Sequence, residues 1–529
     1  MTGAQLMIRC LEREGVQYVF GVPGEETLDL NDALLDSSIQ FISVRHEQAA
    51  AFMADVWGRL TGRAGVCLAT LGPGATNLAT GLADADLDRA PVVAITGQLS
   101  RDLLHKESHQ YVDIVEAFRP FTKWNTRVGS RAVIPEVVRK AFKVAQEEKP
   151  GTCHLELPED VAEEPAEGEP LRVDRPRRPS PDRPSLARAA DLINRAERPL
   201  ILAGNGVIRG HASKELRLLA ERAGIPVVTT FMAKGAIPAD HPLHVMTVGL
   251  ASGDYERAGF AKADLIIAVG YDPVEYGPAR WNKGEAQIVH LDFTAAEVDA
   301  HYQPAVEVVA DVREALELAA PLVAVRNDRR PPERPAPDPR AAADRFPLLP
   351  QRILADLQAA LAPEDLVISD VGAHKLWVAK SYGARVPNTV IISNGFAAMG
   401  IGLPGAIAAK LALPERRVVT VTGDAGLLMN IQELETARRL GLSFVVLIFR
   451  DDGYGVIRWK QERRFHRTAG VDFGNPDFVM LAEAFGCRGL RIDKASALRP
   501  ALDTALRTAG PVLIDCPVDY TENDRLVEP

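Results

Sequence analysis

Short runs of wholly apolar residues are the feature that most restricts how this chain of 529 residues can fold. They are rich in Val and Ile and alternate with segments of helical spacing, as in "GVCLAT", "LIIAVG" and "FVVLIF". A strand that is apolar at every position is buried on both faces, as in a parallel sheet covered by helices on either side. The pattern therefore predicts an α/β protein built on parallel sheets.

Two segments rich in Pro and Arg divide the chain. Residues 163–185 and 326–350 contain too few apolar residues to form a core, as is typical of linkers. Each block between them has its own set of apolar runs and the length of an ordinary domain. We therefore predict three doubly wound parallel-sheet domains, over residues 1–165, 186–325 and 346–529.

Composition argues against several classes of partner. A net charge of −10 argues against binding to nucleic acid through phosphate neutralisation. No apolar run has the length of a membrane span, and the first residues lack the apolar core of a signal peptide. The 5 cysteines are scattered without paired spacing, which indicates reduced, buried thiols. We expect a cytoplasmic protein with neither a nucleic-acid nor a membrane partner.

Carboxylates follow two of the apolar runs in the last block. Asp424 follows "VVTVTG", and Asp451 follows "FVVLIFR" after one intervening helical segment, so both acids should lie at the same edge of a parallel sheet. Two carboxylates beside a helix N-terminus suit a divalent cation that holds a phosphate or diphosphate. Gly423 and Gly426 would allow such a ligand to approach the backbone closely. The alternative is that Asp424 only caps the following helix.

A third acid, Glu47, follows "FISV" in the first block and begins an amphipathic helix. A glutamate at a helix start is explained equally well by the helix dipole. A Gly-Pro-Gly turn at residues 72–74 opens a second helix of small residues, but a single glycine-rich loop is weak evidence for a site.

Taken together, these motifs resemble those of thiamine-diphosphate (ThDP) enzymes. The family motif is usually Gly-Asp-Gly followed by Asn-Asn; here Ala425 replaces the last glycine, and Arg450 and Asp451 replace the two asparagines. The resemblance implies a Mg²⁺ ion held by the side chains of Asp424 and Asp451 and by the carbonyl of Gly453. Aspartate in place of asparagine keeps an oxygen ligand and adds a negative charge.

The resemblance extends to the segment "RHEQAAAFMADVWGRLTG", where Glu47 matches the family's catalytic glutamate. That glutamate binds N1′ of the aminopyrimidine and favours the imino tautomer that accepts the C2 proton. A buried, apolar setting would keep its carboxyl group protonated. In "SNGFAAMGIG", Met399 aligns with the residue that bends the cofactor, and the Ala397 carbonyl with the acceptor of its amino group. An ordinary core methionine is the alternative for Met399.

The resemblance implies a full set of site residues. Glu47 and Gln110 are the expected catalytic residues, and His109, Gln110 and Lys460 the expected substrate contacts; solvent-exposed roles are the alternative for these last three. The expected cofactor contacts are Pro23, Gly24, Glu47, Thr70, Gly72, Gly74, Asn77, Ala397, Met399, Gly423, Asp424, Ala425, Gly426, Asp451, Gly453, Tyr454, Gly455, Val456 and Ile457.

The central block favours one branch of the family. The segment "VGYDPVEYGPARWNK" resembles catabolic, FAD-independent acetolactate synthases, whereas the FAD-dependent enzymes carry a basic segment there. We therefore expect no flavin. Lys460 departs from both branches, which usually carry Gln or Trp at this position, and so leaves the acceptor substrate open.

The activity implied is that of a ThDP- and Mg²⁺-dependent acetolactate synthase, which decarboxylates pyruvate and joins the remaining two-carbon unit to a second pyruvate. The alternatives are another 2-oxo-acid decarboxylase or carboligase, a non-catalytic ThDP-binding relative, and a flavin or nicotinamide oxidoreductase. In this family the glutamate and the metal site come from different subunits. The resemblance therefore implies a homo-oligomer, at least a dimer, and favours a tetramer.

Overall fold

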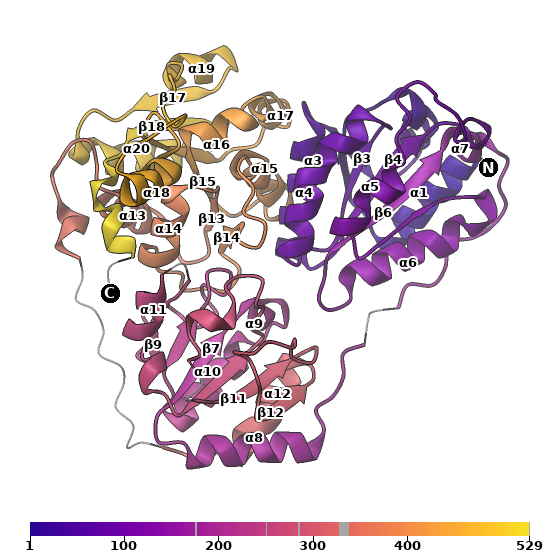
Figure 1. Ribbon diagram of the computed structural model, residues 1–529. Helices are drawn as coiled ribbons and strands as arrows, with labels where there is room; N and C mark the ends of the chain where they lie inside the picture. The colour runs from indigo at the N-terminus through magenta and orange to yellow at the C-terminus, as the bar shows by residue number, and fades with distance from the viewer. Residues whose placement is uncertain (175–176, 250, 284–285, 327–337, 528–529) are drawn as a thin grey trace. The chain divides into compact units, whose positions relative to one another are not determined.

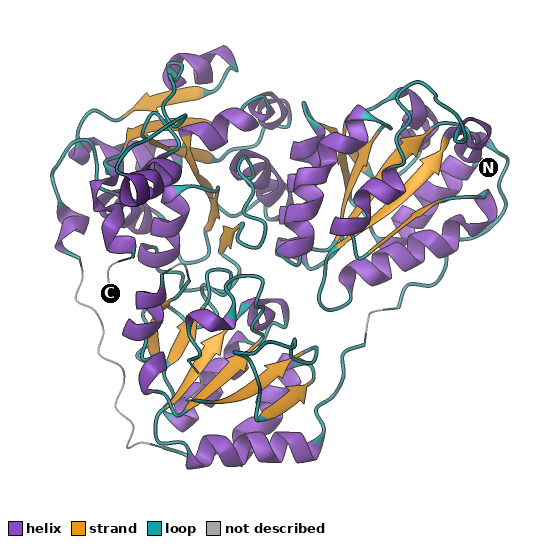
Figure 2. Cartoon of the chain, viewed as in Figure 1, coloured by secondary structure: helices purple, strands orange, loops and turns teal. Residues whose placement is uncertain are grey.

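The computed structural model describes residues 1–174, 177–249, 251–283, 286–326 and 338–527 (Figure 1). Parts of the predicted linkers 163–185 and 326–350 and the last two residues of the predicted third domain lie outside these ranges. The described residues form three parallel sheets of six strands each, with helices on both faces of each sheet (Figure 2). The predicted α/β architecture is therefore confirmed.

The first sheet has the strand order β2-β1-β3-β4-β6-β5. Its strands are β1 (Tyr18–Gly21), β2 (Gln40–Ser43), β3 (Gly65–Ala69), β4 (Val92–Gln98), β5 (Trp124–Arg127) and β6 (Thr152–Pro158). Its helices are α1 (Gly3–Glu14), α2 (Leu28–Leu35), α3 (Glu47–Thr61), α4 (Pro73–Leu87), α5 (Ile114–Phe118), α6 (Ile134–Gln146) and α7 (Glu159–Glu163). The His46 ring caps the start of α3, and Gly62 ends the helix in the left-handed conformation that glycine allows.

The second sheet has the strand order β12-β11-β10-β7-β8-β9. Its strands are β7 (Pro199–Ala203), β8 (Val227–Thr229), β9 (His244–Thr247), β10 (Leu265–Val269), β11 (Gln287–Asp292) and β12 (Val306–Val309). Its helices are α8 (Arg183–Arg195), α9 (Asn205–Arg209), α10 (Ser213–Ala223), α11 (Ser252–Arg257) and α12 (Val312–Ala319).

The third sheet has the strand order β14-β13-β15-β16-β18-β17. Its strands are β13 (Leu366–Ser369), β14 (Val390–Ile392), β15 (Val418–Gly423), β16 (Val445–Arg450), β17 (Arg488–Arg491) and β18 (Val512–Pro517). The helices in this part of the sequence are α13 (Pro350–Ala360), α14 (Ala373–Ser381), α15 (Gly402–Ala412), α16 (Asp424–Met429), α17 (Glu433–Arg439), α18 (Gly455–Phe465), α19 (Phe478–Ala484) and α20 (Leu498–Ala505).

The inter-residue contacts group the chain into two units. Unit 1 comprises Met1–Pro176, Gly395–Glu415 and Leu428–Ser443, and therefore includes α15 and α17. Unit 2 comprises Arg177–Asn394, Arg416–Leu427 and Phe444–Pro529, and includes the second and third sheets. One boundary between the units falls within the predicted linker 163–185 and none within 326–350, so the three predicted domain ranges stay a prediction.

Strands β15 and β16 are parallel neighbours, with Gly423 opposite Phe449. Asp424 and Asp451 therefore follow adjacent strands at one sheet edge, as predicted from the sequence. The single helix predicted for the segment after Asp424 is wrong: α16 ends at Met429 and α17 begins at Glu433. The break coincides with Asn430, whose side chain is used in contacts outside the helix. In the described part of the chain, no helix combines the length and apolarity needed to cross a membrane.

Candidate active site

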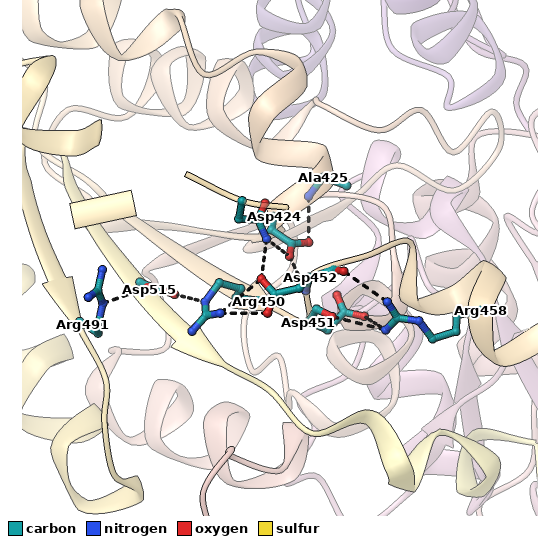
Figure 3. A network of polar contacts seen from close by, with 9 residues as sticks. Asp424, Ala425, Arg450, Asp451, Asp452, Arg458, Arg491 and Asp515 are labelled. Carbon is teal, nitrogen blue, oxygen red and sulfur yellow. Dashed lines mark hydrogen bonds and ion pairs between the residues drawn. The ribbon is translucent and has the colours of Figure 1, made fainter. Parts of the chain in front are cut away.

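Asp424 is buried at the first position of α16. Its Oδ1 accepts a hydrogen bond from the Ala425 N–H at 2.9 Å, and its Oδ2 accepts from the Asp452 N–H at 2.8 Å (Figure 3). The Asn475 side-chain amide also donates to Oδ2, at 2.8 Å. Burial outweighs these donors and raises the pKa of Asp424 above its ordinary value. Asp424 thus fixes the loop that follows β16 through the Asp452 backbone.

Asp451 follows β16, and its Oδ2 is buried without a hydrogen-bond partner. The nearest cation is Arg458, whose Nη1 lies 3.6 Å from this oxygen. Burial and then the negative charge of Asp424 raise the pKa of Asp451 to about 7. A buried carboxylate oxygen without a donor, beside a second carboxylate, fits a divalent cation.

A third oxygen is available beside the two carboxylates. Asn475 donates one amide to both Asp424 and Asp452, and its own Oδ1 is buried without a hydrogen-bond partner. Among the described residues, no three His, Cys, Asp or Glu side chains are arranged to hold a metal ion. A cation here would therefore need amide or backbone oxygens as well as Asp424 and Asp451.

Arg450, which stands where the family motif has asparagine, points away from the Asp424–Asp451 pair. Its Nε donates to Asp515 on β18 at 2.8 Å, and its Nη1 contacts Asp452 at 3.0 Å. Arg450 and Arg458 lie on opposite sides of the carboxylates (Figure 3). Arg450 therefore ties the loop to a neighbouring strand and balances the charge of Asp452 and Asp515.

His374 was not singled out from the sequence, although the same strand-end rule applies to it. It lies in the first turn of α14, which follows β13, the neighbour of β15. A Cβ atom on Gly423 would lie 3.4 Å from the His374 ring, and the ring Nε2 is buried without a hydrogen-bond partner. Burial lowers the pKa of His374 to about 3, so the ring is neutral.

Glu47 is the first residue of α3, and the Asn77 side-chain amide donates to its Oε2 at 2.9 Å. A Cβ atom on Gly74 would lie 3.4 Å from its Oε1, so three of the predicted residues meet at the start of α4. In this single chain Glu47 is half-buried, not fully buried as we expected. Its carboxylate is held from α4 but remains partly accessible.

The remaining residues predicted near Glu47 form two further contacts. The Thr70 hydroxyl donates to the Glu26 carboxylate, and Gly24 packs against Thr70; Pro23 beside it is exposed. Glu26 was not predicted, and no local sequence signal marks it.

The loop that carries His109 and Gln110 is exposed in this chain. Gln110 has a φ of +57°, and its carbonyl would lie 2.6 Å from a Cβ atom on Gly72. The structure thus brings Gln110 against the turn at 72–74 through its backbone.

Residues 395–400 are held by a carboxylate of α4 and by the carboxylate that follows its last residue. The Ala398 N–H donates to Asp84 Oδ1 at 3.1 Å, and the Gly395 N–H donates to Asp88. Between these contacts Ala397 has a φ of +61°, which a residue with a side chain rarely adopts. The backbone around Ala397 and Met399 is therefore fixed by side chains from the first sheet's helices.

Asp84 and Asp88 belong to a buried cluster around Arg59 on α3. Arg59 Nε lies 2.7 Å from Asp55 Oδ1, its Nη2 lies 3.6 Å from Asp84 Oδ2, and it also contacts Asp88. The Arg59 side chain is 8% exposed and all three carboxylates are 0% exposed. The cluster holds three carboxyl groups and one guanidinium group, and the Gly395 and Ala398 N–H groups supply further donors to it.

Comparison with known proteins gives the family. Models described as thiamine pyrophosphate enzyme N-terminal TPP binding domain, central domain and C-terminal TPP binding domain match residues 1–117, 186–318 and 370–516. A probable acetolactate synthase large subunit from Methanocaldococcus jannaschii is 37% identical over 100% of this chain and 94% of its own length. The chain belongs to the thiamine pyrophosphate enzymes.

Two further relatives of this thiamine pyrophosphate enzyme match over nearly the whole chain. The acetolactate synthase of Bacillus subtilis is 36% identical over 99% of this chain and 94% of its own length. The catabolic acetolactate synthase of Raoultella terrigena is 37% identical over 99% of this chain and 96% of its own length. The resemblance drawn from the motifs is confirmed, and with it thiamine diphosphate as the cofactor of the family.

In the matched C-terminal range of this thiamine pyrophosphate enzyme, α18 follows the Asp451 loop. Gly455 packs against the Asp451 carboxylate, and Val456 is half-buried. Trp459 is buried and donates its Nε1–H to Asp524 at 2.8 Å. Tyr454, Ile457 and Lys460 are exposed in this chain.

Proposed function

We propose that this thiamine pyrophosphate enzyme is an acetolactate synthase. It would take two molecules of pyruvate, release one CO₂ and produce 2-acetolactate. The observation that carries the proposal is the similarity to acetolactate synthases over nearly the whole chain, at 36% and 37% identity. Glu47 held by Asn77 and the two acids after β15 and β16 support it, because they supply the groups that such a reaction requires.

The cofactor would be held at the edge of the third sheet. The proposed Mg²⁺ ligands are Asp424, Asp451 and the carbonyl of Gly453, and the unpartnered Asp451 Oδ2 supports this assignment. The neutral His374 ring and the backbone from Gly423 onward would face the diphosphate. Thiamine diphosphate, when bound, supplies the electron sink for decarboxylation.

Glu47 would hold and exchange a proton at N1′ of the cofactor's pyrimidine, while Asn77 fixes the direction of its carboxyl group. Ala397 would offer its carbonyl, and Met399 its side chain, to the same part of the cofactor. The other proposed cofactor contacts are Pro23, Gly24, Thr70, Gly72, Gly74, Ala425, Gly426, Tyr454, Gly455, Val456 and Ile457.

The substrate contacts that we propose are Gln110, His109 and Lys460. All three are exposed in the single chain. A second subunit is therefore part of the proposal: the protein would be at least a dimer, with a tetramer favoured. A cytoplasmic location, the absence of flavin and the domain limits 1–165, 186–325 and 346–529 remain predictions.

Incubation of the purified protein with pyruvate, thiamine diphosphate and Mg²⁺ tests the proposed function. We expect CO₂ and 2-acetolactate in equal amounts, the latter measured as acetoin after acid treatment. Formation of CO₂ without acetolactate would instead indicate another decarboxylase or carboligase. Formation of neither product by a protein that binds the cofactor would indicate a non-catalytic relative.

We predict that cation affinity depends on pH through Asp451. Its pKa is raised to about 7 in the metal-free protein, so a proton competes with the cation below this pH. Affinity for Mg²⁺ should therefore rise about tenfold per pH unit below pH 7 and level off above it. Calorimetric titration with Mg²⁺ from pH 6 to pH 8, at saturating thiamine diphosphate, measures this.

The Asp451→Asn variant keeps an oxygen ligand at this position but has no carboxyl group to titrate. Its affinity for Mg²⁺ should therefore not depend on pH through this residue. Any titration of the cofactor's phosphate affects the variant and the wild type equally. Asp472→Asn is the matched control, because Asp472 also pairs with Arg458 but is 75% exposed. Parallel pH profiles for the wild type and Asp451→Asn would show that protonation of Asp451 does not control cation binding.

A further inference from the structure

The residues on both sides of Glu47 are bound by one short stretch of unit 1, at the start of α17. Glu433 is 0% exposed; its Oε1 accepts from the Arg45 N–H at 3.0 Å, and its Oε2 accepts from the Thr436 hydroxyl at 2.7 Å. The His46 backbone also donates to the Glu433 carboxylate. The two residues that precede Glu47 are thus held through their backbone.

Asn430 makes the corresponding contact after Glu47. It is 0% exposed, and its Nδ2 donates to Gln48 Oε1 at 3.1 Å. The same Nδ2 donates to the carbonyl of Gly400 at 2.9 Å. Asn430 therefore binds both the residue after Glu47 and the residue after Met399.

These contacts affect Glu47 because it is the first residue of α3. The first N–H groups of a helix have no acceptor within the helix, so the course of the chain into α3 depends on side-chain acceptors. His46 caps the Gln48 N–H, and Glu433 accepts from the residue before His46. Without Glu433, the chain that leads into Glu47 would lose its buried acceptor and could shift.

We propose that Asn430 and Glu433 are positioning residues for Glu47. They touch neither substrate nor cofactor in this assignment; they fix the backbone on either side of the carboxylate that holds the proton. The inference rests on the proposed function, because that function makes Glu47 a catalytic residue. A shift of about 1 Å in a catalytic group can lower a rate by roughly a hundredfold, so such contacts affect the reaction directly.

A purely structural role makes a different prediction. If the role were only structural, replacing Glu433 would lower the free energy of unfolding. Proton exchange in the molecules that remain folded would be unchanged. The test therefore needs a readout of local backbone order in the cofactor-free protein and a readout of proton transfer in the loaded protein.

The variants are Glu433→Met, Asn430→Ala and the control Arg438→Gln. Glu433→Met removes the acceptor of the Arg45 N–H. Arg438 lies in the last turn of the same helix and is exposed. In the cofactor-free protein, amide hydrogen exchange over residues 44–50 should be faster in both test variants and unchanged in the control. In the loaded protein, exchange of the C2 proton of bound thiamine diphosphate should slow by about tenfold or more, with cofactor affinity unchanged.

The outcomes separate the two proposals. If the wild type does not accelerate C2 exchange over free thiamine diphosphate, the role of Glu47 and the proposed function both fail. If the wild type accelerates it and both test variants do so equally, the proposed function stands and the positioning role is overturned. Should Glu433→Met fail to fold, Asn430→Ala alone decides, because it removes the separate contacts that Asn430 makes with Gln48 and Gly400.

Discussion

The Glu47→Gln variant is expected to lose turnover of pyruvate by about 10²–10⁴-fold, the range that a positioned acid–base group contributes. Glutamine keeps the shape of the side chain and an oxygen that accepts from Asn77, so the folded structure should persist. It cannot, however, exchange a proton at N1′ of the cofactor. Initial rates at saturating pyruvate and thiamine diphosphate measure the loss, and thermal unfolding checks that the protein remains folded.

A matched control separates this role from that of an ordinary helix-start glutamate. Glu136 lies in the first turn of α6 and is exposed, so it complements the helix dipole without a site around it. The Glu136→Gln variant should turn over pyruvate at the wild-type rate. Equal rates for the Glu47 and Glu136 variants would show that Glu47 has no part in the reaction.

The second large effect is on stability. Replacement of Arg59 by methionine should lower the free energy of unfolding by about 3–5 kcal/mol, the usual cost of removing one partner from a buried ionic cluster. The change leaves the buried carboxylates of Asp55, Asp84 and Asp88 without their cation. Burial already raises the pKa of Asp55 above its ordinary value even with Arg59 present.

The loss should also depend on pH. Without Arg59, the folded variant would bind more protons at this cluster than the unfolded chain does. Its stability should therefore fall as pH rises, and the difference from wild type should be larger at pH 8 than at pH 5.5. Denaturation by urea at the two pH values measures this. A loss that shrinks as pH rises would contradict the assignment of the cluster as ionic.

Arg195→Met is the control for Arg59→Met. Arg195 also pairs with an aspartate four residues earlier, Asp191, at 2.9 Å, but its side chain is 77% exposed. An exposed pair contributes less than about 1 kcal/mol, so this variant should remain close to wild type. Similar losses in the two variants would mean that burial of the Arg59 cluster has little energetic consequence.

The central strands were predictable from sequence, whereas most edge strands were not. Strands such as β3, β10 and β16 are buried along most of their length, so apolar runs mark them. Five strands were missed, β5, β9, β12, β14 and β17, and all five lie at sheet edges. Segments such as "WNTR" and "RGLR" are half-exposed and lack an apolar run, since an edge strand has solvent on one side.

The residues of the site were likewise predicted only in part. The positions of Asp424 and Asp451 followed from the rule that ligands meet the ends of parallel strands. His374 obeys that rule too, but it does not directly follow its strand as Asp424 and Asp451 follow β15 and β16. Asn430 and Glu433 could not be found this way, because their partners lie far away in sequence and no local pattern records a contact made only in the folded chain.

Helices α15 and α17 belong to unit 1 although they come late in the sequence. This affects how segments can be exchanged between related enzymes. A fragment that stops before residue 395 would keep the first sheet but expose the face of α3 that packs on α15. Asp84 and Asp88 would lose two backbone donors, and the Arg45 N–H would lose its acceptor. A chimera that takes its N-terminal third from another enzyme must therefore take these two later helices from the same parent.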